Sequence, residues 1–395
     1  MPVTRLIRTL QVSTFFISAT YGVMFTMLDD YRDEYGISES LLGFVVAIGF
    51  FASFFSQLTL APMADRGHSR RLIVIGFATT ILGCLLMAFG TSAPALIVGR
   101  LVMGLGTGMS LPALRRIIIV ADPEHLGANM GRLLSVDVAG FAMGPVISVA
   151  TVGPLGIPAP FLFLATVLGL MALALSRLDV PETATDDRPT ERLAFDLLRH
   201  RAVTAAVLIG LALFLMIGTF DSLWAIMMED LDAPEWMANV GITLFALPMI
   251  FLGPYGGRLS QRVGPYRAGA AGMLLGAGFM CLYGLLPSPY MMMGVFLLHT
   301  INDGLTVTSA GVAVGIAAPP SRQAGAQGLL GGLQTLIGGV SATAAGWSYD
   351  STGRGTTFVG CAVIMCILVV LGLSLAGDLR SSRQRPEPAN LEPAV

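Results

Sequence analysis

Lysine is missing from this 395-residue sequence, and all 23 basic residues are arginine. Its absence excludes a lysine Schiff base and the lysine of a phosphate-binding loop. Charged residues are also scarce, at 12% of the chain, whereas soluble domains carry about 25%. With 54% hydrophobic residues and a mean hydropathy of +0.75, the composition predicts an integral membrane protein.

Cysteine is nearly as rare, and its four positions show no CxxC or Cys/His spacing. Neither a metal site nor a disulfide framework is therefore predicted. The predicted connections contain no nucleophile motif, metal cluster or phosphate loop, so the chain is not expected to be an enzyme. No cofactor and no nucleic-acid partner are expected either.

Apolar runs recur along the whole chain, each near the roughly 20 residues that cross a bilayer as a helix. Hydropathy and Gly/Pro punctuation predict an all-α integral membrane fold of twelve helices in two six-helix halves related by a pseudo-repeat. The predicted spans are 10–30, 41–62, 72–91, 94–115, 127–150, 158–176, 202–226, 235–256, 266–286, 289–316, 324–347 and 355–376.

The arginines fall in alternate connections, and this orients the predicted helices. Arg32 and Arg354 fall on one side, Arg100 lies within a span, and the other 20 lie at the termini or on the opposite side. Because basic loops stay in the cytoplasm, both termini are expected there. The 20 are Arg5, Arg8, Arg66, Arg70, Arg71, Arg115, Arg116, Arg132, Arg177, Arg188, Arg192, Arg199, Arg201, Arg258, Arg262, Arg267, Arg322, Arg380, Arg383 and Arg385.

One charge-dense stretch, 177–201, separates the first six predicted spans from the last six. The expected divisions are an N-terminal half at 1–176, a cytoplasmic linker at 177–201, a C-terminal half at 202–376 and a disordered cytoplasmic tail at 377–395. Within the linker, "ERLAFDLLRHR" suits either a short amphipathic helix on the inner surface or a plain solvated connection.

Two basic turns follow the second and the eighth predicted spans, as a parallel repeat requires. They read "APMADRGHSRR" and "GRLSQRVGPYR", and in register Asp65 meets Gln261. The same repeat sets Gln334 opposite Asp137. A carboxylate at a helix end can hold arginine and backbone N–H groups in charge-assisted bonds, so Asp65 is expected to form a latch at the inner side.

The first basic turn resembles a signature of the major facilitator superfamily. The resemblance to this family extends over essentially the whole length of the chain. The resemblance rests on Asp65, Arg66, Arg70 and Arg71, which it implies to be a gating turn; the chain departs from the signature at Ala61 and His68, where the family usually has glycine. A second similarity is Arg100 followed by spaced glycines in "GRLVMGLGTG".

A third signature lies in the fifth predicted span. There "GFAMGP" resembles the antiporter-type motif of the family through Gly140, Gly144 and Pro145. Small residues allow helices to approach closely, and proline frees a backbone carbonyl. This motif favours export as the direction of transport.

Ionisable side chains inside predicted spans are costly and are by default functional candidates. Asp137 and Asp303 fall near the middle of their spans, where coupling ions tend to bind. Burial disfavours the ionised carboxyl group, which allows protonation near neutral pH. His299 lies one helical turn before Asp303, and Arg100 is expected to bias the charge of both carboxylates.

The substrate site is predicted only in outline. Candidate cavity residues are Tyr21, Phe25, Asp221, Asn302 and Gln334, although Asp221 suits a solvated mouth equally well. Aromatic residues are plentiful and hydrogen-bonding groups few, which suits an apolar or amphipathic solute better than a sugar.

The resemblance implies a secondary transporter that works by alternating access, as a monomer, in a prokaryotic cytoplasmic membrane. The preferred function is proton-driven efflux of an apolar or amphipathic small molecule, a drug or a secreted metabolite. Proton-coupled uptake or facilitated diffusion of a small organic solute is the first alternative. A transport-inactive sensor or assembly factor on the same fold is the alternative of another class.

Overall fold

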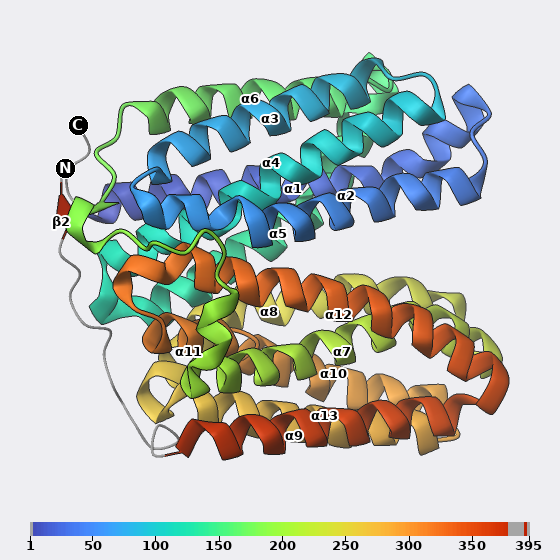
Figure 1. Ribbon diagram of the computed structural model, residues 1–395. Helices are drawn as coiled ribbons and strands as arrows, with labels where there is room; N and C mark the ends of the chain where they lie inside the picture. The colour runs from blue at the N-terminus through green and yellow to red at the C-terminus, as the bar shows by residue number, and fades with distance from the viewer. Residues whose placement is uncertain (1–2, 378–390, 393–395) are drawn as a thin grey trace.

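The computed structural model describes residues 3–377 and 391–392, and of residues 239–243 it describes the backbone alone. The chain forms two helical halves that lie one beside the other, with the first half above the second in Figure 1. The first half contains α1 (Val3–Tyr35), α2 (Glu39–Thr59), α3 (Ser69–Phe89), α4 (Ala93–Ala121), α5 (Leu126–Leu155) and α6 (Ala159–Ser176). The second contains α7 (Arg201–Asp230), α8 (Glu235–Val263), α9 (Pro265–Leu285), α10 (Pro289–Thr306), α11 (Ser309–Ala317), α12 (Gln323–Thr352) and α13 (Arg354–Ala376).

The predicted fold class is confirmed by this arrangement. Ten of the described helices are long and apolar enough to cross a membrane, and α8 and the α10 and α11 pair take the two remaining places. The predicted tenth span, 289–316, was wrong in one respect, because it is broken between α10 and α11. Three β-branched residues in a row, Thr306, Val307 and Thr308, surround the break, and such residues lower helix propensity.

Each half encloses its own apolar core, while many large apolar side chains also face outward. Phe51 is 60% exposed, Phe251 68% and Val370 61%. An aqueous surface would disfavour so much exposed apolar area, whereas hydrocarbon does not. The outward apolar faces are therefore the ones that contact lipid.

The connection between the halves is more ordered than the sequence indicates. It contains a two-residue strand, β1 (Glu182–Thr183), and two short 3-10 helices, η3 (Thr185–Asp187) and η4 (Phe195–Arg199). β1 pairs antiparallel with β2 (Leu391–Glu392). The rest of the predicted tail, including Arg380, Arg383 and Arg385, lies outside the described residues apart from Gly377.

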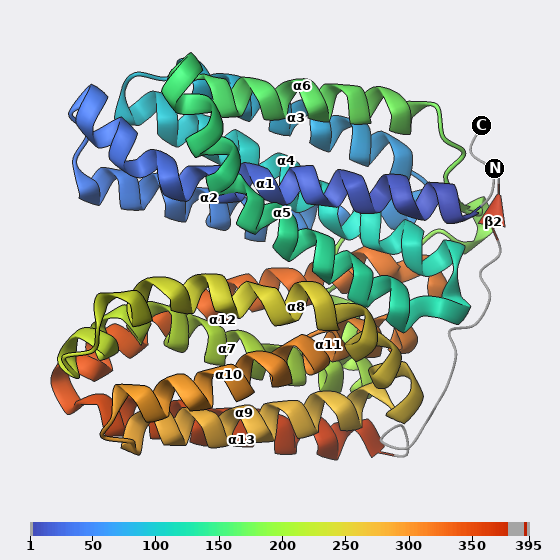
Figure 2. The same ribbon diagram turned by 180° about the vertical axis from the view of Figure 1, so that it is seen from behind.

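The two halves meet at the end of the bundle where α1 begins and where this connection runs, called the linker end below (Figures 1 and 2). Here α5 packs on α8, and α12 packs on α2, α4 and the 3-10 turn η1 (Ala61–Arg66). Gly67 ends η1 with φ +79°, a conformation that side-chain-bearing residues rarely adopt. The linker end is therefore the closed end of the structure.

Candidate functional site

A cavity of about 200 Å³ lies between the two halves. Four helices of the first half and two of the second, α7 and α12, line it. The lining residues are Ile17, Ser18, Tyr21, Phe50, Ser53, Gln57, Leu111, Arg115, Asp137, Phe141, Phe214, Gly331, Gln334 and Thr335. The cavity thus combines aromatic and aliphatic side chains with polar groups that converge on it.

Asp137 is the acidic residue among those that line the cavity. One carboxylate oxygen accepts a hydrogen bond from the Ser18 hydroxyl, and the other lies 3.9 Å from Nη2 of Arg115. The Asp137 side chain is 29% exposed and that of Arg115 24%. Both groups are therefore shielded from bulk water, where charges interact more strongly, yet both reach the cavity.

Arg115 is the site residue that the sequence analysis missed. The predicted span 94–115 ended at Arg115, which we counted with the inner connection, but α4 continues to Ala121, more than a turn further. Arg115 and Arg116 therefore lie within α4, and Arg132 lies within α5. The available signal was "RRIIIVAD", whose apolar run extends the helical segment past both arginines.

Two amides complete the polar part of the cavity. Gln57 donates a hydrogen bond to the Ser53 hydroxyl at 3.2 Å, and Gln334 donates one to the Gly210 carbonyl at 3.2 Å. Gln334 and Asp137, which the repeat set opposite one another, thus lie in the same cavity. Tyr21, another predicted cavity residue, also lines it.

Arg100 does not lie in the cavity. Its side chain is completely buried, and its guanidinium stands 4.1 Å over the ring centre of Tyr21. Nε and Nη2 of Arg100 have no hydrogen-bond partner among the described residues. Within the same residues, no ion pair joins Arg100 to Asp137 or to Asp303. Arg100 therefore reaches the cavity only through Tyr21, whose hydroxyl lies 2.9 Å from Thr107 Oγ1.

The His299 and Asp303 pair lies in the core of the second half, on α10. Nε2 of His299 is 3.4 Å from Oδ2 of Asp303, and the two side chains are 1% and 0% exposed. His299 Nδ1 lies 3.1 Å from the Tyr283 hydroxyl, and the Phe279 ring lies tilted beside the imidazole, with ring centroids 5.2 Å apart. Neither residue is among those that line the central cavity, so the predicted coupling residues form two separate sites.

The remaining predicted cavity residues lie outside the lining set. Asn302 donates hydrogen bonds to Asp303 and to the Gly272 carbonyl, each at 3.2 Å, so it belongs to the buried pair. Phe25 packs edge-on against Phe141, with ring centroids 5.5 Å apart. Asp221 is exposed on α7.

Asp65 forms the latch that joins the halves at the linker end. It is 1% exposed and accepts hydrogen bonds from the backbone N–H groups of Ala324 at 2.9 Å and Gly325 at 2.6 Å, at the start of α12. Nε of Arg116 lies 3.2 Å from the same carboxylate. A carboxylate at a helix N-terminus is favoured by the free N–H groups and by the helix dipole.

The linker holds the rest of the first basic turn. The Glu182 carboxylate accepts hydrogen bonds from the N–H groups of Ser69 and Arg70, both at 2.9 Å, which caps the start of α3. Arg66 is half-buried and Arg71 is exposed. Within 191–201, where a short amphipathic helix or a plain solvated connection was expected, the structure has the short 3-10 helix η4. Charged side chains of the linker also bind the adjacent helices.

The linker also binds the second half of the molecule. Arg322, just before α12, pairs with Asp196 through two contacts of 2.9 and 2.6 Å. In the first half, Arg116 donates one hydrogen bond to Thr183 Oγ1 of the linker at 2.7 Å and another to the Pro181 carbonyl of the linker at 2.8 Å. The linker is thus part of the closed end rather than only a tether.

Glycines bring α5 and α8 into contact at the linker end. A Cβ atom on Gly127 would collide with the Gly257 carbonyl, and one on Gly131 with the Gly253 carbonyl. Gln261 on α8 accepts a hydrogen bond from the Gly127 N–H at 2.8 Å. The closed end therefore depends on backbone-to-backbone packing between the halves.

The antiporter-type motif allows another pair of helices, α1 and α5, to approach closely. A Cβ on Gly140 would meet the Phe15 carbonyl, and one on Gly144 would meet the backbone of Gly22 and Val23. Pro145 lies within α5, where it leaves the Phe141 carbonyl without its usual helical partner. The motif thus fixes α5, and with it Asp137, against α1.

We expect Gly131→Ala to disfavour the closed linker end by about 1–3 kcal/mol, the usual cost of overpacking. The added methyl group meets backbone, which cannot move aside without separating the halves. Spin labels at the exposed positions Arg71 and Val263, one in each half, would report a larger population of long distances. Gly169→Ala is the matched control, because nothing lies within 4 Å of its added carbon; equal distances in both variants would contradict the prediction.

Among the described residues there is no group of three or more His, Cys, Asp or Glu side chains placed to hold a metal ion. The Asp137 cluster offers a carboxylate beside a guanidinium, and both groups face the cavity between the halves.

Comparison with known proteins places the chain in a family. The model described as Major Facilitator Superfamily matches residues 10–225 and 206–395. The quinolone resistance protein NorA of Staphylococcus aureus (strain MSSA476) is 25% identical over 230 residues, which is 56% of this chain and 58% of NorA. The chain thus spans less than two thirds of the length of this curated relative.

Solved structures share the fold at lower identity. The human organic anion transporter MFSD10 (TETRAN) has a TM-score of 0.75 and 17% identity, with 94% of this chain and 100% of that chain covered. The E. coli fucose:proton symporter FucP has a TM-score of 0.76 and 16% identity, with 95% and 99% covered. At these identities the likeness concerns the fold alone.

Proposed function

The chain belongs to the major facilitator superfamily, and we propose that it is a proton-coupled exporter of apolar or amphipathic small molecules. The family and the fold are those of transporters, which confirms the prediction that the protein is not an enzyme. The observation that carries the proposal is the Asp137 and Arg115 pair, shielded but exposed to a cavity between the two halves.

In the proposed cycle the substrate and a proton compete at Asp137. An ionised Asp137 attracts Arg115 and accepts the Ser18 hydrogen bond, and it can also bind a donor or cationic group of the substrate. Protonation removes the negative charge, which weakens all of these interactions. Alternating protonation of Asp137 would therefore release the substrate on one side and allow binding on the other.

We place the linker end in the cytoplasm of a prokaryotic cell, as the arginine distribution indicates. The structure then represents the state in which the cavity is closed toward the cytoplasm. Opening toward the cytoplasm requires the Asp65 latch to release the start of α12 and the glycine contacts of α5 and α8 to separate. One half rocking against the other around the cavity would accomplish both.

The remaining predicted coupling residues take secondary roles in this proposal. The His299 and Asp303 pair is a second proton site, sealed within the second half in this state. Arg100 acts on the cavity by fixing Tyr21 through its cation–π contact. Protons, the substrate and the bilayer are the proposed partners, the proton gradient is the energy source, and a monomer is the proposed working unit.

Two observations favour efflux of an amphipathic solute. The cavity combines four aromatic side chains, Tyr21, Phe50, Phe141 and Phe214, with hydrogen-bonding groups from both halves, and an amphipathic solute can use both. The similarity to NorA, named for quinolone resistance, supports the same direction and substrate class.

Everted membrane vesicles test the proposal. An imposed acid-inside gradient is expected to drive ethidium, an amphipathic cation, or a fluorescent quinolone into vesicles that contain the protein, and collapse of the gradient should release it. Vesicles without the protein are the control. Movement driven in the opposite direction would favour proton-coupled uptake; gradient-independent movement would favour facilitated diffusion. If a broad compound panel showed no movement, the proposal would yield to a transport-inactive sensor.

A further inference from the structure

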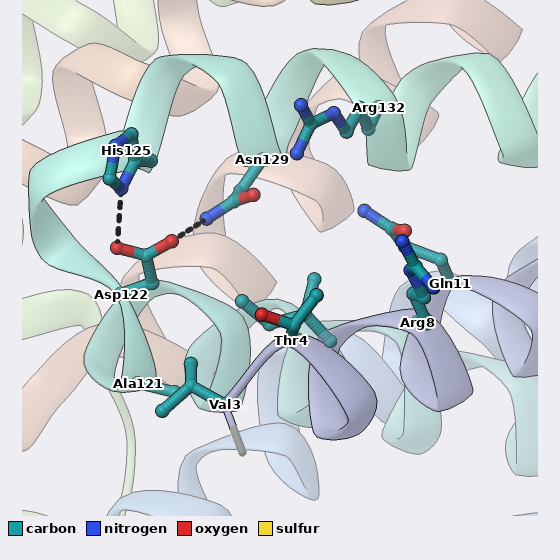
Figure 3. A pocket seen from close by; sticks show the side chains of 10 residues that line it. Val3, Thr4, Arg8, Gln11, Ala121, Asp122, His125, Asn129 and Arg132 are labelled. Atoms are coloured by element: carbon teal, nitrogen blue, oxygen red, sulfur yellow. Dashed lines mark hydrogen bonds and ion pairs between the residues drawn. The ribbon is translucent and has the colours of Figure 1, made fainter.

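A second and larger hollow lies at the linker end, outside the central cavity. Its volume is about 640 Å³. The first turns of α1 form one wall and the α4 and α5 connection forms the other (Figure 3). The lining residues are Val3, Thr4, Ile7, Arg8, Gln11, Ala121, Asp122, His125, Asn129 and Arg132.

Three side chains with nitrogen donors in this hollow have no partner in the described part of the chain. Arg8 and Arg132 are both exposed, and neither makes a hydrogen bond or an ion pair with a described residue. The side-chain nitrogen of Gln11 is shielded from solvent and also has no hydrogen-bond partner there. A shielded donor without a partner costs free energy, so an external acceptor would be stabilising at this point.

The one carboxylate of the hollow is already engaged. Asp122 lies 2.9 Å from Nδ1 of His125 and accepts a hydrogen bond from Asn129 at 3.0 Å. Partial burial opposes its ionisation, but these hydrogen bonds outweigh burial and hold the pKa of Asp122 below its usual value. Figure 3 shows Arg8, Gln11 and Arg132 together on the side away from this carboxylate.

The other part of the lining is apolar and lies at the ends of two candidate membrane spans, one of which begins at Val3 while the other ends at Ala121. Val3, Ile7 and Ala121 contribute to the wall, and Val3 is 46% exposed. Paired guanidinium groups suit phosphate oxygens, which they contact through planar forked donors. The adjoining apolar wall suits a group that carries acyl chains.

We infer that this hollow, framed by Arg8, Gln11 and Arg132, is a binding site for a phosphate group, the headgroup of an anionic phospholipid of the adjacent leaflet. The site lies next to the inner gate, because Arg132 follows Gly131 directly and Asn129 lies between the two glycines that pack on α8. An occupied site would fix the start of α5 against α1 when the linker end is closed.

Native mass spectrometry of the full-length protein, titrated in micelles with dioleoylphosphatidylglycerol, tests the inference. The double variant Arg8→Gln and Arg132→Gln is expected to raise the dissociation constant at least about tenfold, as the loss of charge-assisted bonds implies. Gln11→Leu, which removes the amide and with it the unpaired donor, should weaken binding less while keeping both charges. The control Arg177→Gln and Arg199→Gln removes the same charge from exposed positions at the same end.

The possible outcomes distinguish the sources of phosphate. Loss of binding in the pocket variants, with the control unchanged and with dioleoylphosphatidylcholine bound much more weakly, supports the lipid site. Displacement of the lipid by millimolar inorganic phosphate would support the phosphate site but assign it to a soluble ligand. Equal weakening in the pocket and control variants would overturn the inference, because surface charge alone would then explain binding.

Discussion

Asp137→Asn protein is expected to bind substrate and exchange it across a vesicle membrane, but to lose gradient-driven accumulation by at least about tenfold, or about 1.4 kcal/mol. Asparagine retains the size of the side chain and can still interact with Ser18, so the cavity should keep its shape. The amide cannot take up and release a proton in the physiological range. Transport should therefore continue downhill and stop responding to the pH gradient.

Two further variants make this prediction specific. Asp187→Asn removes an exposed carboxylate of the linker and should leave accumulation unchanged. Asp303→Asn tests the second, sealed site in the core of the second half. Uncoupling by Asp303→Asn together with normal coupling in Asp137→Asn would move the proton-coupling role from the cavity to the His299 and Asp303 pair.

Asp65→Ala should produce the largest conformational effect. The substitution removes the acceptor of the Ala324 and Gly325 N–H groups and leaves Arg116, itself 1% exposed, without its counter-charge. Breaking one side of a buried ion pair costs about 3–5 kcal/mol. Because Asp65 contacts α12 of the other half, the substitution should mainly destabilise the state in which the linker end is closed.

Distances between spin labels at Arg71 and Val263 measure that effect. We expect Asp65→Ala to shift the population toward long distances and to reduce transport, whereas Asp186→Ala in the exposed part of the linker should do neither. A closed population that stays unchanged in Asp65→Ala would show that the latch does not hold the halves together.

The fold was largely predictable because its main determinant is local. Each apolar run is long enough to span a bilayer, and the arginines mark alternate connections, so span count and position follow from the sequence. The ends of the helices were less accurate, since a helix can continue through polar residues, as α4 does through Arg115 and Arg116 into a further apolar stretch. The break after Thr306 was missed because no proline marks it and the nearest glycine, Gly304, lies within α10.

The candidate site was predictable in part. Asp137 was identified from its depth, Gln334 from the repeat register and Tyr21 as an aromatic candidate, and the structure places all three in one cavity. Depth alone could not separate Asp137 from Asp303, because it does not show whether a side chain faces the other half or its own core. The linker contacts of Glu182 and Asp196 join residues more than 100 positions apart, a pairing that no local pattern indicates.

Proton release on substrate binding tests the proposed exchange at Asp137 most directly. The purified protein would be held in a weakly buffered solution with a pH indicator, and a compound transported in the vesicle assay would be added. We expect the wild-type protein to release protons as the compound binds and the Asp137→Asn protein to bind the compound without release. Equal proton release by both proteins would contradict the proposal that substrate and proton compete at Asp137.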